Sequence, residues 1–172
     1  MIKSIAIFGA TEKHASVLAE SLASNNYRLL LLSEVKQALT DLRDQILIKT
    51  PSADIELLDC STEASWQADS IILALSYELQ EMIAAWIGDF VTQKTVIAYV
   101  DSAQEALNAL PSTGLQNLLP NAHIISLYLT NDQEKQKVFY VGGLDEEALN
   151  ETMTLLMLSG FIPGISQLTV TP

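Results

Sequence analysis

The chain has 172 residues, of which 49% are hydrophobic and 17% are charged, and its formal net charge is −12. This length fits one domain with a full core, and the composition excludes a disordered chain. The acidity argues against nucleic-acid binding, because phosphate contacts need lysine or arginine and only nine are present. No apolar run approaches the roughly 20 residues of a membrane span, and the N-terminus lacks the features of a signal peptide. We therefore expect one cytoplasmic domain over residues 1–172.

Cysteine and histidine are too scarce to build a metal centre. Cys60 is the only cysteine, so no internal disulfide can form. His14 and His123 lie far apart, and neither has a second ligand at a metal-binding spacing. We expect no metal site.

Candidate strands and helices alternate over the first hundred residues. The expected strands are residues 5–8, 27–32, 55–58, 69–75 and 95–100. Apolar residues at helical spacing lie between them at 15–22, 35–46 and 79–90, and residues 61–68 form a connection with one helical turn. Ser33 is the expected cap of the second helix. The alternation predicts right-handed crossovers and a mostly parallel sheet.

The clearest helical pattern belongs to residues 79–90. Its apolar positions follow the i, i+3, i+4, i+7 spacing without a gap: Leu79, Met82, Ile83, Trp86, Ile87 and Phe90. The pattern predicts an amphipathic helix.

The final third is less regular. We expect a helix at 104–110, a turn at 111–114, a strand at 123–129, a loop at 130–136 and a strand at 137–141 closed by two glycines. A helix follows from Asp145 to about Leu158, and Gly160 ends it. Residues 161–170 form the expected last edge strand.

Residues 3–22 combine a buried strand, a turn opened by Gly9 and an amphipathic helix, which is the order of the first unit of a dinucleotide-binding half. The three positions of the glycine fingerprint carry Ala10, Glu12 and Ala15. Ala15 is a mild change, and Ala10 is tolerable where φ is negative. Glu12 adds bulk and like charge where backbone must approach a pyrophosphate. The alternative interpretation is a first-turn acid favoured by the helix dipole.

Four stretches carry a resemblance to a known family: residues 5–22, 68–83, 118–130 and 138–164. Together they resemble the deazaflavin-dependent NADP reductase family, whose domain is shared with metalloreductases of the six-transmembrane epithelial antigen type. The resemblance implies a single-domain α/β Rossmann fold, with a mostly parallel, doubly wound sheet and helices on both faces. It also implies hydride transfer between a nicotinamide cofactor and a second small molecule.

The resemblance implies a cofactor site at the carboxyl ends of the strands. The residues expected there are Gly9, Ala10, Thr11, Glu12, Lys13, His14, Ser33, Glu34, Leu75, Ser76 and Asp101. Glu34 stands where the family has an arginine that reads the 2′-phosphate of NADP, and an acid suits the ribose hydroxyl of NAD. NAD is therefore favoured over NADP, unless Glu34 is merely an early helical acid. His14 could contact a phosphate or act as an acid–base group, and a surface histidine is the alternative.

Other departures leave a second hypothesis open. Ser76, Asp101 and Leu129 replace polar or proline-containing turns of the family, and Asp59 is either an adenine contact or a solvated strand-end acid. No catalytic side chain is assigned, and the hydrolase elbow, the phosphate-loop ending and a Tyr-X-X-X-Lys pair are absent. The chain is then either a nicotinamide-dependent oxidoreductase or a non-catalytic binding protein that has lost its cofactor. Either form could dimerise through an edge strand or the Trp86 helix.

Overall fold

The computed structural model describes residues 3–107, 113–131 and 137–164 of the chain. Its strands are β1 (Ser4–Phe8), β2 (Arg28–Leu32), β3 (Ile55–Leu57), β4 (Ser70–Leu73), β5 (Thr95–Tyr99), β6 (His123–Asn131), β7 (Lys137–Gly143) and β8 (Ile162–Pro163). The first seven expected strands are confirmed in place, although β6 and β7 extend past their predicted ends, and β8 covers only two residues of the expected last strand. These two strands pair antiparallel from Ile125 with Gly143 to Asn131 with Lys137, and this pairing gives the terminal residues partners.

The strands form one sheet in the order β3–β2–β1–β4–β5–β6–β7–β8. The first six strands run parallel, and β8 runs parallel to β7. The order 3-2-1-4-5-6 is that of the doubly wound Rossmann fold, in which the crossovers leave a crevice between β1 and β4. This confirms the expected fold class.

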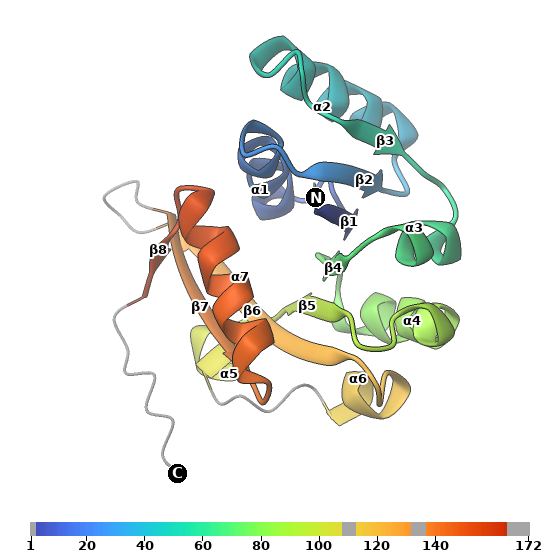
Figure 1. Cartoon of the computed structure of the whole chain (residues 1–172), viewed down its shortest axis with the longest axis vertical. Helices are drawn as coiled ribbons and strands as arrows, with labels where there is room; N and C mark the ends of the chain where they lie inside the picture. The colour runs from blue at the N-terminus through green and yellow to red at the C-terminus, as the bar shows by residue number, and fades with distance from the viewer. Residues whose placement is uncertain (1–2, 108–112, 132–136, 165–172) are drawn as a thin grey trace.

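Helices cover both faces of the sheet (Figure 1). They are α1 (Lys13–Ser24), α2 (Lys36–Lys49), α3 (Ser61–Gln67), α4 (Tyr77–Ile87), the 3-10 turn η1 (Gly88–Phe90), α5 (Ala103–Leu107), α6 (Thr113–Leu118) and α7 (Glu146–Leu158). Side chains of α1, α2 and α7 meet the sheet in one buried apolar cluster, and those of α3, α4 and α6 meet its other face in a second. Strands such as β1 are buried on both faces, which explains their continuous apolar sequence.

Three local expectations are wrong. Ser33 does not cap α2, which begins at Lys36 behind Val35. The connection after β3 is the seven-residue helix α3 rather than one turn. Residues from Thr113 form α6, where a turn was expected. At Gly114 this helix packs against α4, where an added Cβ would meet the ends of the Glu81 and Tyr77 side chains.

Parts of other expected elements lie outside the described residues. They are the end of the helix after residue 107, most of the loop at 130–136 and the last strand beyond residue 164. Within the described ranges no helix is long and apolar enough to cross a bilayer.

Only part of the apolar stripe of α4 faces the core. The buried side of α4 consists of Gln80, Ala84 and Ile87. Met82 is 41% exposed and Trp86 is 54% exposed. Most of the stripe is therefore available to line something other than the sheet.

Candidate functional site

The turn between β1 and α1 lies at the crevice of the fold. Gly9 has a φ of +74°, and a Cβ added to it would overlap the carbonyl oxygen of Ala74. The backbone N–H groups of Gly9 and Ala10 each donate to the carbonyl oxygen of Leu32 at 3.0 Å. Ala10 is buried and is not among the residues with positive φ. Gly9 is thus the one position of the turn that requires glycine, and it brings the ends of β1, β2 and β4 together.

The rest of the turn faces the edge of the sheet. The hydroxyls of Thr11 and Ser33 lie 2.7 Å apart, which ties the turn to the end of β2. Glu12 occupies the N-cap position of α1 in an extended conformation and makes no side-chain capping bond. Its side chain and that of Lys13 are exposed. The first-turn amides of α1 are therefore left without a carboxylate cap, and amides of this kind attract anions.

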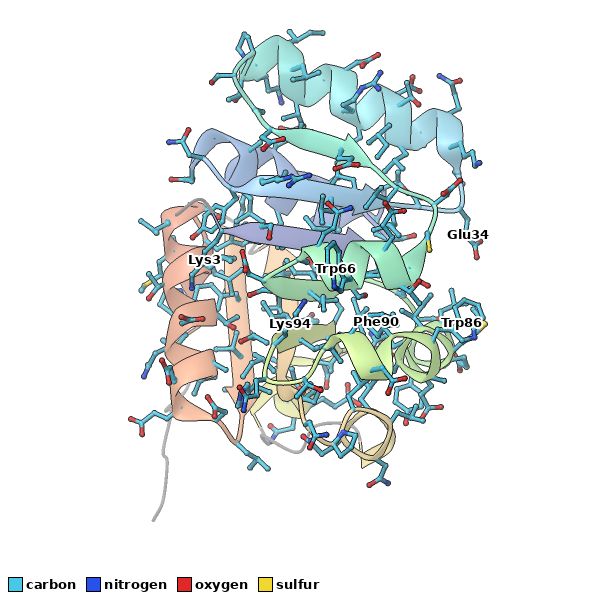
Figure 2. All side chains as sticks on the ribbon, turned by 45° about the vertical axis from the view of Figure 1, so that its right-hand side comes forward. Lys3, Glu34, Trp66, Trp86, Phe90 and Lys94 are labelled. Atoms are coloured by element: carbon cyan, nitrogen blue, oxygen red, sulfur yellow. The ribbon has the colours of Figure 1, made fainter. Side chains whose placement is uncertain are left out.

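A hollow of about 350 Å³ lies on the β2 side of this turn; we call it the β2-side hollow. Its floor and one wall are mostly carbon, because the exposed stripe of α4 contributes Leu79, Met82, Ile83 and Trp86. Ser33 and Glu34 line its opposite side, and Figure 2 shows Glu34 and Trp86 at the same edge of the molecule, with Lys3 at the opposite one. The unusual exposure of the α4 stripe is explained by this hollow.

A second hollow, of about 570 Å³, lies on the other side of the turn, at the ends of β4, β5 and β6; we call it the β5-side hollow. The residues that line it are Glu12, Lys13, His14, Ala74, Leu75, Ser76, Leu79, Tyr99, Val100, Asp101, Tyr128, Leu129 and Thr130. Leu75 and Leu79 line both hollows. The two hollows are therefore neighbours that meet beside the Gly9 turn.

Two titratable groups in the β5-side hollow are perturbed. Partial burial, and then the neighbouring charge of Lys13, hold the pKa of His14 below its ordinary value. Burial raises the pKa of the Tyr99 phenol far above its ordinary value, so Tyr99 stays protonated. The Tyr99 hydroxyl is shielded from solvent and has no hydrogen-bond partner among the residues that the structure describes. Both groups are thus uncharged near neutral pH.

Gln80 holds the strand ends under both hollows, and sequence reasoning missed it. The side chain is 2% exposed, and its Nε2 donates to the carbonyl oxygens of Leu75 and Tyr99 at 2.8 Å each. A third contact, to Leu73, is longer at 3.4 Å. The only sequence signal was a polar residue inside the helical pattern of α4, which by itself does not distinguish a buried amide from an exposed one.

The structure brings the eleven predicted site residues to one edge of the sheet. Nine of them line a hollow. The β2-side hollow is lined by Gly9, Ser33 and Glu34, the β5-side hollow by Glu12, Lys13, His14, Ser76 and Asp101, and both hollows by Leu75. Ala10 is a core residue, and Thr11 contacts Ser33 instead. Asp59 lines the rim of the β2-side hollow, where it lies 3.7 Å from Lys36.

Two hydrogen bonds between backbone N–H groups and side chains fix the loop after β5. The Glu105 N–H donates to the Ser102 hydroxyl at 3.2 Å, and the Glu105 carboxylate accepts from the Asp101 N–H at 3.2 Å. Asp101 is therefore held at the mouth of the β5-side hollow. Over the described part of the chain, no three metal-ligating side chains gather in one place.

No protein-family model and no curated protein sequence matches this chain. Its fold is similar to that of a pyrroline-5-carboxylate reductase from Coxiella burnetii (TM-score 0.71, 12% identity), with 98% of this chain and 60% of that chain covered. An imine reductase from Myxococcus stipitatus in complex with NADP⁺ matches with a TM-score of 0.71 and 12% identity over 94% of this chain and 54% of that one. A prephenate dehydrogenase from A. aeolicus in complex with NAD⁺ matches with a TM-score of 0.71 and 12% identity, over 95% of this chain and 59% of that one.

At such identities the likeness establishes the fold alone, the Rossmann fold that this chain shares with these three structures. The part of the predicted resemblance that concerns this fold is confirmed, whereas its deazaflavin-dependent character stays a prediction. The chain spans 60%, 54% and 59% of the length of these three structures. Dimerisation through an edge strand or the Trp86 helix also stays a prediction.

Proposed function

We propose that this chain binds a nicotinamide dinucleotide, with NAD preferred over NADP, and serves hydride transfer to or from a second small molecule. The observation that carries the proposal is the pair of hollows that meet beside the Gly9 turn at the crevice of the sheet. A dinucleotide has two bulky ends joined by a pyrophosphate, and doubly wound sheets bind it across this crevice.

The β2-side hollow suits the adenosine end. Its apolar wall from α4 offers Met82 and Trp86 to a flat base. Glu34 lies exposed just beyond β2, where its carboxylate can accept a hydrogen bond from a ribose 2′-hydroxyl. The same carboxylate would repel the 2′-phosphate of NADP, and this supports the preference for NAD.

The β5-side hollow suits the nicotinamide end. The bound cofactor supplies the hydride chemistry, so the chain needs to bind and orient the ring rather than to provide a nucleophile. Ser76 offers a hydroxyl there, and Asp101 a carboxylate. The substrate, or a deazaflavin as second reactant, would approach from this side. The chain matches little more than half the length of the three compared structures, so groups outside the matched part can select the substrate.

The turn between the hollows has to accept the pyrophosphate. Glu12 works against this, but its side chain is exposed and can turn into solvent, and Lys13 balances its charge. The uncapped amides of α1 and its dipole remain favourable for an anion. The residues present therefore fit a dinucleotide, with Glu12 weakening rather than blocking the site.

The test is a calorimetric titration of the purified chain with NAD, NADP and ADP-ribose. We expect NAD to bind more tightly than NADP. ADP-ribose, which lacks the nicotinamide, should bind more weakly than NAD because it fills only one hollow and the turn. If none of the three ligands binds, the proposed function is wrong.

Glu12 and Leu129 favour the second candidate, a non-catalytic binding protein on the same scaffold. Both line the β5-side hollow, and Glu12 places a carboxylate where a pyrophosphate would lie. The double variant Glu12→Gly, Glu34→Arg separates the candidates. A gain in NADP affinity of about 1–3 kcal/mol would indicate an intact pocket kept closed by charge. No gain would favour the non-catalytic protein.

A further inference from the structure

Tyr99 carries a buried polar group that nothing in the described fold satisfies. Tyr99 ends β5, and its side chain packs against the apolar cluster beneath α1. Its hydroxyl is shielded from solvent and makes no hydrogen bond. Leaving such a group unpaired lowers stability, and this cost disappears when a partner arrives.

The Tyr99 side chain forms part of a wall of the β5-side hollow, and a ligand oxygen reaches its shielded hydroxyl when the side chains that cover it move aside. Tyr99 lines the β5-side hollow together with His14, Ser76 and Tyr128. Its backbone is anchored, because its carbonyl oxygen accepts from the buried Gln80 amide at 2.8 Å. A donor held in this way on a strand end is preorganised, so a ligand does not have to order it.

The surroundings define which acceptor fits. Burial keeps the phenol protonated, so its hydroxyl can donate a hydrogen bond to an acceptor oxygen of a ligand. The hollow already contains the carboxylates of Glu12 and Asp101 against one ammonium, that of Lys13. A further anionic group next to them would be repelled, whereas an uncharged oxygen would not.

We propose that the Tyr99 hydroxyl donates a hydrogen bond to an uncharged carbonyl or carboxamide oxygen of the ligand that enters the β5-side hollow. This inference rests on the proposed function, for which the nicotinamide carboxamide is the acceptor closest at hand. Under this proposal Tyr99 is a ligand-binding residue that selects which chemical group the β5-side hollow accepts.

The experiment compares Tyr99→Phe with the wild-type chain in titrations of NAD and ADP-ribose. We expect about a tenfold loss of affinity for NAD and no change for ADP-ribose, which has no carboxamide. Tyr27→Phe is the matched control, because Tyr27 packs against the same apolar cluster but lines hollows with Lys3 and Glu151 at the opposite end of the strands. It should change neither affinity.

Melting temperatures without ligand test the premise separately. Removing an unpaired buried hydroxyl should leave Tyr99→Phe as stable as the wild-type chain or more so. A lower melting temperature would mean that the hydroxyl already has a partner, and would overturn the assignment.

The binding outcomes distinguish the two levels of the proposal. Unchanged NAD affinity in Tyr99→Phe, or equal losses for NAD and ADP-ribose, would overturn the role of Tyr99 and leave dinucleotide binding standing. Wild-type affinity for ADP-ribose equal to that for NAD would also overturn it. If the wild-type chain binds neither ligand, the proposed function fails and the role of Tyr99 fails with it.

Discussion

The β2-side and β5-side hollows lie on either side of one turn and are built in different ways. The β2-side hollow is walled by an apolar stripe on the helix α4, with one exposed acid, Glu34, at its rim. The β5-side hollow is walled by strand ends and contains His14, Tyr99 and Asp101. The first can hold a flat apolar group by contact area, and the second must hold its ligand by directed polar contacts. This difference matches the two ends of a dinucleotide.

The largest effect should come from the turn that lies between the two hollows. Gly9→Ala would force positive φ on alanine and push its Cβ into the Ala74 carbonyl. We expect a loss of about 3 kcal/mol or more in the free energy of unfolding, measured by chemical denaturation.

Gly160→Ala is the control for this variant. Gly160 has a similar φ of +79°, but nothing lies within 4 Å of its added Cβ. Its loss should be about 1–2 kcal/mol, the strain of the left-handed conformation alone. Equal losses in the two variants would show that β1 and β4 do not approach as closely as we describe.

Gln80→Leu should damage both hollows together. The change leaves the carbonyl oxygens of Leu75 and Tyr99 without the amide that now binds them. We expect about 2–3 kcal/mol lower stability and weaker binding of both NAD and ADP-ribose, measured by denaturation and calorimetry. Gln37→Leu is the control, because Gln37 is exposed and bonds only Asp41 within its own helix. Undiminished stability in Gln80→Leu would contradict the role given to this amide.

Glu34→Arg should act on the β2-side hollow alone. The change replaces repulsion of a 2′-phosphate by attraction, and we expect the NADP to NAD affinity ratio to rise about tenfold or more. Glu147→Arg makes the same charge change on α7, in the hollow that Lys3 lines at the opposite end of the strands, and should leave the ratio nearly unaltered. A similar rise in both variants would mean that net charge, rather than Glu34 itself, sets the preference.

The smallest effect concerns His14 in the β5-side hollow. Because its pKa lies below the ordinary 6.5, the unfolded chain takes up a proton on His14 at higher pH than the folded chain does. The contribution of neutral His14 to the free energy of unfolding is therefore complete above the ordinary pKa of 6.5. It is lost as the pH falls below 6.5 toward the lower pKa of the folded chain. When the pH is lowered from about 7.5 to 5.5, the melting temperature of His14→Gln should fall less than that of the wild-type chain. Equal losses in the two proteins would contradict the lowered pKa.

Much of the fold could be predicted from the sequence, because apolar runs and helical spacing report burial directly. The strands from β1 to β6 lie where those patterns indicate. The role of Ser33 could not be predicted from its neighbours in the sequence, because its hydroxyl contacts Thr11 across the fold instead of capping the following helix. The helix α6 packs against α4 at Gly114, a contact that its own short sequence does not report.

The candidate site was predictable in its position but only partly in its chemistry. The turn and the strand ends followed from the order of elements, and they do meet at one edge. The stripe of α4 could not be assigned to a hollow, because spacing shows that residues share a face but not what that face contacts. Gln80 and the hydroxyl of Tyr99 were missed for a related reason, since burial of a single polar atom leaves no periodic pattern.

The most direct measurement is the affinity of the wild-type chain for NAD, compared with that for NADP and ADP-ribose under the same conditions. If one dinucleotide spans the two hollows, NAD will bind more tightly than ADP-ribose, which fills only the β2-side hollow and the turn, and more tightly than NADP, which meets Glu34. The absence of binding by all three ligands would contradict the central claim and leave a Rossmann scaffold that has lost its cofactor.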